Sequence, residues 1–238
     1  ADVEVNVGEG SDLKVVESTN DKEKRDLFEI SQSAGRILVK RPNSHYFGIE
    51  PQHKIEIWLP SSYRSTLMIT TSSGDINLNG VLELEKLETT QSSGNLVGRE
   101  AIKAKEVQLT TSSGDKRLEG IETDTYEITS SSGTTIIKSL KGKGSCMASS
   151  GEIEINSLIG EAHEIYTSSG KITIGEIEGE LEMEASSGDL KLGTVIGESW
   201  RLRTTSGEII MKALEGKGNC ESSSGDIEIE ELRLTGDA

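Results

Sequence analysis

Cysteine and histidine are the residues of this chain best suited to redox chemistry, metal binding or nucleophilic catalysis, and the chain has few of them. Cys146 and Cys220 lie in nearly identical contexts, GKGSCMASSGEIEI and GKGNCESSSGDIEI. They are 74 residues apart, four units of the repeat described below, which is about 19 Å at about 4.8 Å per unit. A disulfide needs Cα atoms within about 7 Å. We therefore expect two unpaired cysteines packed in the core.

The three histidines are His45, His53 and His163, and no HExxH or paired Cys-His spacing surrounds them. The sequence therefore predicts no zinc site. His163 lies 37 residues from both Tyr126 and Trp200. In a stacked repeat these large side chains would alternate with smaller residues and fill the interior, which is the interpretation we favour. A stacking platform for a sugar or a peptide is the alternative.

Serines and acids flank a recurring glycine, and this row is the candidate binding face. Its members are Ser73, Asp75, Ser113, Asp115, Ser150, Glu152, Ser187, Asp189, Ser224 and Asp226. Calcium binding of the nonapeptide β-roll type needs two glycines per turn and a nine-residue period. Neither is present, and Asn95, Thr134 and Lys171 interrupt the acids, so we expect no metal and no cofactor. A hydrogen-bond ladder between stacked serines is the simpler explanation, and we favour it over ligand binding.

Residues for enzymatic catalysis are not apparent. No GxSxG, P-loop or dinucleotide fingerprint occurs in the chain. A polysaccharide-cleaving β-helix would need carboxylates about 5 to 10 Å apart, held in a cleft that long loops build. From Ile69 onward the repeats differ in length by at most two residues, which leaves no room for such loops. We predict no catalytic residue, and a polysaccharide-acting enzyme is the least favoured alternative.

The elements that would position these residues follow from an internal repeat. The pattern Ser/Thr-Ser-Gly recurs at intervals of 18 to 20 residues and ends at Gly74, Gly94, Gly114, Gly133, Gly151, Gly170, Gly188, Gly207 and Gly225. Apolar and polar residues alternate inside each repeat, which is typical of a strand with one buried face. Such a strand can bury that face only by stacking on its neighbours. The sequence therefore predicts an all-β, single-domain parallel β-helix.

The predicted β-helix has about 12 coils of 18 to 20 residues, and the preference of parallel crossovers favours a right-handed sense. Residues 67–238 form the regular part. Residues 1–66 are expected to be irregular coils of the same solenoid, because FEISQSAGRILVK places Gly35 two coils before Gly74 and KIEIWLP supplies the coil between. Residues 18–25 and 41–51 are the expected protruding loops. A second glycine column, at Gly142, Gly160, Gly179, Gly197 and Gly216, predicts another corner.

Composition and charge limit the partners. Hydrophobic residues make up 33% of the chain and the net charge is −16, so nucleic acid and anionic lipid surfaces should be repelled. No run of 18 apolar residues exists, so we expect no membrane span within the chain. No signal peptide is recognisable, and the chain starts at Ala1 without an initiator methionine, so we expect a processed or shortened N-terminus.

The SSGDI and SSGEI units, preceded by KIEIWLPSS and TLMITTSSGDINL, resemble a bacterial family of adhesin-like domains of unknown function with β-strand repeats. The resemblance covers nearly the whole chain. It implies a β-helical fold and an extracytoplasmic location at the cell surface or envelope. It implies no ligand and no catalytic residues.

Two functions remain as hypotheses. The first is a non-enzymatic adhesin-like or scaffolding module that binds a protein or glycan through an extended face. The second is a regulatory or sensory envelope protein that contacts a partner chain through a solenoid edge, since the C-terminal IEIEELRLTGDA has no obvious cap. An end-to-end homo-oligomer would use the same edge.

Overall fold

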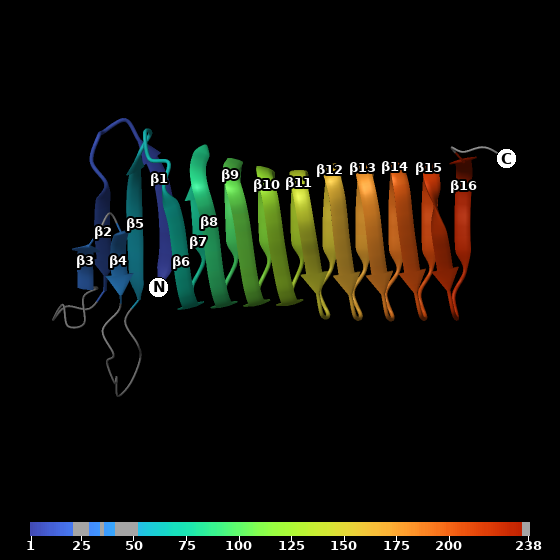
Figure 1. Cartoon of the computed structure of the whole chain (residues 1–238). Coiled ribbons are helices and arrows are strands. Elements are labelled where there is room, and N and C mark those ends of the chain that lie inside the picture. The colour runs from blue at the N-terminus through green and yellow to red at the C-terminus, as the bar shows by residue number, and fades with distance from the viewer. Residues whose placement is uncertain (21–28, 34–35, 41–51, 235–238) are drawn as a thin grey trace.

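The computed structural model describes residues 1–20, 29–33, 36–40 and 52–234, and every regular element in these ranges is a β-strand (Figure 1). The strands are β1 (Asp2–Gly8), β2 (Lys14–Thr19), β3 (Glu29–Ser33), β4 (Arg36–Lys40), β5 (His53–Pro60), β6 (Thr66–Ser73), β7 (Ile76–Asn79), β8 (Leu82–Ser93), β9 (Leu96–Ser113), β10 (Lys116–Ser132), β11 (Thr135–Ala148), β12 (Ile153–Thr167), β13 (Ile172–Ala185), β14 (Leu190–Thr204), β15 (Ile209–Ser222) and β16 (Ile227–Leu234).

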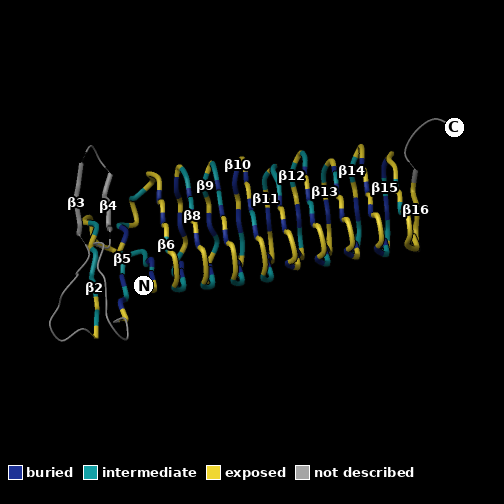
Figure 2. Tube along the Cα trace, turned by 90° about the horizontal axis from the view of Figure 1, so that it is seen from below, coloured by how far each residue is buried: buried dark blue, intermediate teal, exposed yellow. Residues whose placement is uncertain are grey.

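The strands from β6 to β16 form a β-solenoid, as predicted. Each coil hydrogen-bonds in parallel to the coil before it, so that Ile153, Ile172 and Leu190 stand in one register column. These three side chains are buried. Buried and exposed residues alternate along each coil, which Figure 2 shows as a change of colour along the tube. The right-handed sense of the coil stays a prediction.

The coils are fewer than expected, because the described solenoid has about nine turns rather than twelve. The first 66 residues account for the difference. β1 lies between β7 and β5 and is parallel to both, so it continues the stack. β2, however, pairs antiparallel with β5, and β3 pairs antiparallel with β4. The prediction that this whole segment forms coils of the solenoid is therefore wrong.

Connection length explains the antiparallel pairing of β3 and β4. Only two residues, 34 and 35, separate these strands. Parallel strands need a connection of about a dozen residues or more, whereas two residues suffice for a hairpin. The expected corner at Gly35 and most of the expected protruding loops, at 18–25 and 41–51, lie outside the described residues.

The core is one continuous column of aliphatic side chains inside the solenoid. In the first two coils one buried position lies eight residues after the corner glycine instead of the seven found in the next coil. Leu82 and Ile102 stand in the column of Ile121, while Val81 is exposed. The shift arises because these coils are 20 residues long, and the extra residue is taken up as a register irregularity after Leu118.

The glycine of the Ser-Ser-Gly corner is required by close packing between coils. A Cβ at Gly170 would overlap the carbonyl oxygen of Gly151, and one at Gly188 would overlap that of Gly170. The same overlap occurs at the corner glycine of every regular coil. Positive φ contributes only in the N-terminal coils, for example 125° at Gly74 and 126° at Gly114. The first corners thus need glycine for both its positive φ and its lack of a Cβ, whereas the later corners need it for the close contact alone.

We predict that Gly170→Ala lowers the free energy of unfolding by about 2–4 kcal/mol, because the methyl group must displace the backbone of the neighbouring coil. Thermal and urea unfolding followed by circular dichroism would measure the change. The adjacent Ser169→Ala is the matched control, since Ser169 is exposed and its backbone hydrogen bond is unaffected. Equal stability of the two variants would contradict the packing argument.

Candidate functional site

The expected binding row runs along the Ser-Ser-Gly corner from coil to coil. Its serines are exposed at every corner, and the exposed bends recur along one side of the tube in Figure 2. Asp75 and Asp115 are partly buried, whereas Glu152, Asp189 and Asp226 are exposed. The structure therefore brings the predicted residues into one row, and their hydrogen bonds divide that row into two parts.

The aspartates of the row bond the backbone of the next coil. Asp75 Oδ1 accepts a hydrogen bond from the N–H of Asn95 at 2.7 Å, and Asn95 Oδ1 accepts one from the N–H of Asp115 at 3.0 Å. Asp115 Oδ1 accepts one from the N–H of Thr134 at 2.9 Å. In each case a side-chain oxygen accepts the hydrogen bond of a backbone N–H group at the corner of the next coil, so that this donor is satisfied. The amide of Asn95, which interrupts the acids in the sequence, does the same task.

The serine hydroxyls form the favoured ladder in the N-terminal coils. Ser93 Oγ donates to the carbonyl of Ser72, and Ser113 Oγ donates to that of Ser92, each at 3.2 Å. In the later coils the serines are linked by backbone hydrogen bonds instead, as where the N–H of Ser150 donates to the Ser131 carbonyl at 2.9 Å. Among the described residues, the hydroxyls of Ser150, Ser187 and Ser224 are left facing solvent. The side chains of the predicted row that are free to bind therefore lie mainly in its C-terminal part, although Asp189 Oδ1 there accepts a hydrogen bond from the N–H of Glu208 at 3.1 Å.

A column that the sequence analysis missed supports the same corner from inside. It lies three residues before each glycine and includes Gln91, Thr167 and Thr204, all buried. Thr167 Oγ1 accepts a hydrogen bond from the N–H of Gly170 at 3.0 Å, and Thr204 Oγ1 accepts one from Gly207 at 3.1 Å. The signal in the sequence is a run of threonine, serine, glutamine and alanine at a position where strict alternation predicts large apolar residues.

Lys116 is the most unusual interior side chain, since it occupies an apolar column and is 0% exposed. Its Nζ donates to the carbonyl of Thr129 at 2.9 Å. Burial lowers the pKa of Lys116 to about 8. Cys146 is also fully buried, and burial raises the pKa of its thiol to about 12, which removes it as a nucleophile at neutral pH. Both Cys146 and Cys220 are unpaired, as expected.

Tyr126 and His163 form a buried pair across the intervening Gly144. The Tyr126 hydroxyl lies 2.8 Å from His163 Nδ1, and His163 Nε2 lies 3.2 Å from the Glu178 carbonyl. Because Nε2 faces a carbonyl, it carries the ring proton, and Nδ1 accepts from the tyrosine. Burial lowers the pKa of His163 and so favours this neutral form. Trp200 stacks in the same column, so the packing interpretation is confirmed and an exposed platform is wrong.

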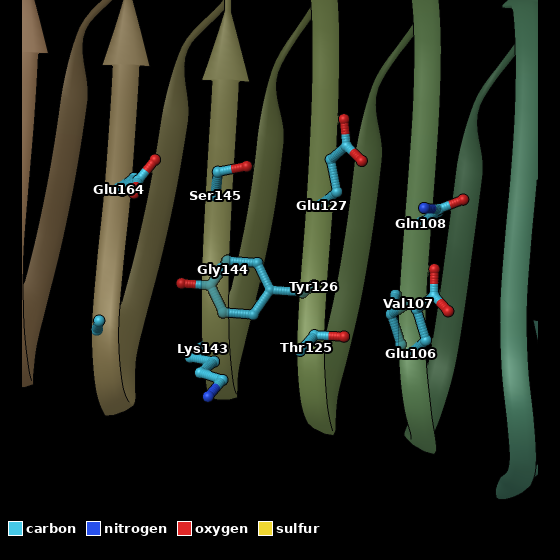
Figure 3. A pocket seen from close by; sticks show the side chains of 11 residues that line it. Glu106, Val107, Gln108, Thr125, Tyr126, Glu127, Lys143, Gly144, Ser145 and Glu164 are labelled. Atoms are coloured by element: carbon cyan, nitrogen blue, oxygen red, sulfur yellow. The ribbon is translucent and has the colours of Figure 1, made fainter.

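The outer surface is hollowed at two places. The first, which we call the strand groove, has a volume of about 410 Å³ and crosses β9 to β12. Figure 3 shows it, with Glu127 and Glu164 beside it and Tyr126 extending across Gly144 beneath. The hollow arises because Thr125, Ser145 and Ala162 are small while the neighbouring glutamates are long. Its rim is mainly acidic.

The second hollow, which we call the corner groove, has a volume of about 750 Å³ and crosses β12 to β15. It follows the second glycine column, where the parallel register shifts in successive coils, for example between Ile159 and Ala162. The second corner predicted from these glycines is therefore confirmed. Gly160, Gly179 and Gly197 form the floor, and the walls are mostly glutamates.

Neither groove assembles a metal-binding cluster among the described residues. No three His, Cys, Asp or Glu side chains in that part of the chain lie close enough to share a metal ion. The same residues contain no helix of a length and apolarity that could cross a membrane. The acidic grooves are suited to attracting cations and basic side chains, because carboxylates stacked from coil to coil create a local negative potential.

We predict that Lys116→Met raises the free energy of unfolding by about 2–3 kcal/mol at pH 7, because the pKa difference between 10.5 and about 8 is the cost of burying the ammonium group. The unfolded chain binds the extra proton between about pH 8 and 10.5, so Lys116 contributes a rise in stability with pH across that window. Above about pH 9 the buried Cys146 thiol contributes a fall, so the rise is measured as the difference between the unaltered protein and the variant.

In Lys116→Met this rise should disappear. Urea unfolding at pH 7, 8.5 and 10 would measure both effects. Lys212→Met removes an exposed lysine of the same size and should change neither quantity. If Lys116→Met were less stable than the unaltered protein, or if its stability depended on pH in the same way, the buried ammonium group would not be destabilising.

Comparison with known proteins places the chain in a family. No curated protein and no solved structure matches it. The family model described as Toastrack DUF4097 matches residues 1–178 and again residues 145–238, and the two matches together span the whole chain. They overlap over about two coils, as expected when successive coils are alike. The β-solenoid described above agrees with the β-helix-like fold of this family. The chain belongs to the Toastrack family, DUF4097, a family of domains of unknown function.

Proposed function

We propose that this domain is a non-enzymatic binding module, adhesin-like or scaffolding, that engages a protein or glycan partner through an extended face of the solenoid. The observation that carries the proposal is the uninterrupted parallel stack from β9 to β16, in which each coil presents equivalent positions at the same place. A surface of this kind offers rows of side chains at about 4.8 Å intervals instead of a closed pocket.

The available face is narrower than the sequence indicates. Asp75, Ser113, Asp115 and Asp189 are engaged in hydrogen bonds between coils. The part of the row able to contact a partner is therefore Ser73 at the N-terminal end and, in the later coils, Ser150, Glu152, Ser187, Ser224 and Asp226. The two acidic grooves extend the same surface. Support for an extracytoplasmic location comes from the resemblance to adhesin-like domains, and we propose the cell surface or envelope on that basis.

Deleting one coil tests whether binding is spread over the rod. Removal of residues 152–170 joins Gly151 to Lys171 and preserves both the Ser-Ser-Gly corner and the stacking of identical column types. We expect the shortened chain to keep its β-sheet circular-dichroism spectrum. Its binding to printed arrays of glycans and of extended peptides should weaken, because the deletion removes Glu152 and shortens the row by one coil.

A full-length variant that removes the free C-terminal part of the row, Ser150→Ala/Glu152→Gln/Ser187→Ala/Ser224→Ala/Asp226→Asn, is the companion to the deletion on those arrays. It should weaken binding more than the deletion does, because the deletion removes only Glu152 of these five side chains. Failure of the unaltered domain to bind either array would overturn the proposal, and release of a product from any glycan would replace it with an enzymatic function.

A second candidate is contact with a partner chain through the strand edge at β16. In the described part of the chain, β16 pairs with β15 on one side only, and Ile227 and Leu232 are 41% and 48% exposed. An unpaired parallel edge with apolar side chains can accept a further strand, either from a partner or from a second copy.

For this candidate we predict a concentration-dependent dimer that Ile227→Lys/Leu232→Lys abolishes, because lysine on an edge strand opposes strand addition. Light scattering after size exclusion would measure the mass. The control, Met68→Lys/Val81→Lys, changes two exposed apolar residues far from the edge and should leave the dimer intact. A monomer at all concentrations would exclude self-association through β16.

A further inference from the structure

The corner groove has features that select one class of partner. Its floor is bare because Gly160, Gly179 and Gly197 stack directly, and a Cβ at Gly179 or Gly197 would overlap the carbonyl oxygen of the glycine below. No side chain can therefore fill the groove from beneath. A backbone lying along it would approach the solenoid backbone closely over β12 to β15, a distance of about 14 Å at the strand spacing.

One wall of the groove alternates apolar and acidic residues. The residues that precede the glycines are Ile159, Glu178, Ile196 and Glu215, and their pairing places them in one column. Glu178, Ile196 and Glu215 line the groove, and Ile159 is the next member of the column, just beyond its lining. Ile159 is 37% exposed and Ile196 is 48% exposed. Large apolar side chains at such exposure are uncommon in the described surface of this chain, and here two of them lie on either side of Glu178. The opposite wall carries Glu161, Glu180 and Glu198, which follow the same glycines.

The charge of these walls is not balanced within the protein. Lys143 lies 3.3 Å from Glu161, but the structure gives no ion pair to Glu178, Glu180, Glu198 or Glu215 in the described residues. Other surface rows place opposite charges on successive coils, as in Lys138–Glu119 at 2.7 Å and Arg203–Glu221 at 2.9 Å. Glutamates stacked at coil spacing repel one another, and a cationic partner would relieve that repulsion.

We propose that the corner groove binds an extended, basic segment of a partner protein that alternates lysine or arginine with aliphatic residues. An extended chain advances about 3.3 Å per residue, so roughly four residues span the groove. Its basic side chains reach the glutamates of both walls, and its aliphatic side chains pack against Ile196 in the groove and against Ile159 just beyond its end. Charge complementarity excludes an acidic glycan or nucleic acid, and the two isoleucines favour a polypeptide over a free polyamine.

This inference rests on the proposed function, since it assigns the extended-face partner to one groove. The test uses the full domain and a fluorescein-labelled peptide Lys-Val-Lys-Ile-Lys-Val, with binding followed by fluorescence anisotropy at 150 mM salt. We expect Glu180→Gln/Glu198→Gln to weaken binding at least tenfold and Ile196→Ser to weaken it several-fold. Both changes affect exposed side chains, so the fold should be retained.

The matched control is Glu127→Gln/Glu164→Gln, which removes the same charge from the strand groove. It should change the affinity by less than twofold. Equal weakening by the two double variants would overturn the proposal in favour of diffuse attraction. An unchanged affinity in Ile196→Ser, with spermine competing as well as unlabelled peptide, would assign the groove to polyamines instead. No binding of the peptide would overturn the groove assignment alone, because the array experiments test the extended face independently.

Discussion

The whole structure depends on the close contact between backbones at the Ser-Ser-Gly corner. From Gly94 onward each corner glycine lies against the carbonyl of the glycine one coil below, and Gly74 lies against that of Ala1, at a distance that leaves no room for a Cβ. That contact fixes where each coil turns, and the position of the turn decides which side chains point inward. The aliphatic columns, the corner hydrogen bonds and the outer grooves all follow from the superposition of these corners. A second side-chain-free column repeats the arrangement at the opposite bend and leaves the floor of the corner groove bare.

Most polar residues around the corner are hydrogen-bonded within the solenoid and are therefore not available to a partner. Buried amide and hydroxyl groups must be bonded, and the corner supplies backbone groups that the parallel ladder does not reach. Thr167 and Thr204 satisfy them from inside, while Asp75, Asn95 and Asp115 satisfy them from outside. The outer surface that remains for recognition therefore lies mainly in the C-terminal coils, where Glu178, Glu180, Glu198 and Glu215 of the corner groove have no ion pair among the described residues.

Periodicity made the solenoid predictable from the sequence. Glycine spacing and alternation gave the columns that contain Ile153, Ile172 and Leu190, and the equal distances among Tyr126, His163 and Trp200 gave their common column. The N-terminal segment could not be predicted in the same way, because strands such as β2 and β3 alternate like those of the coils and only their connections decide the direction of pairing. The grooves were also hidden from the sequence, since they depend on how residues from four coils lie beside one another. The inner threonine column was missed because its small polar residues break the alternation.

The Tyr126–His163 pair has a consequence for how such a repetitive chain finds a single arrangement. Coils that resemble one another could stack with one unit left out, since most columns would still match aliphatic residues with aliphatic residues. The tyrosine, however, reaches the histidine only when a glycine coil lies between them. Omitting that coil would press two rings into adjacent layers and leave the tyrosine without its acceptor. Trp200 above Gly218 imposes the same condition further along. Bulky interior residues that pack opposite glycines thus specify which coils are adjacent, and they give an otherwise uniform stack a defined order.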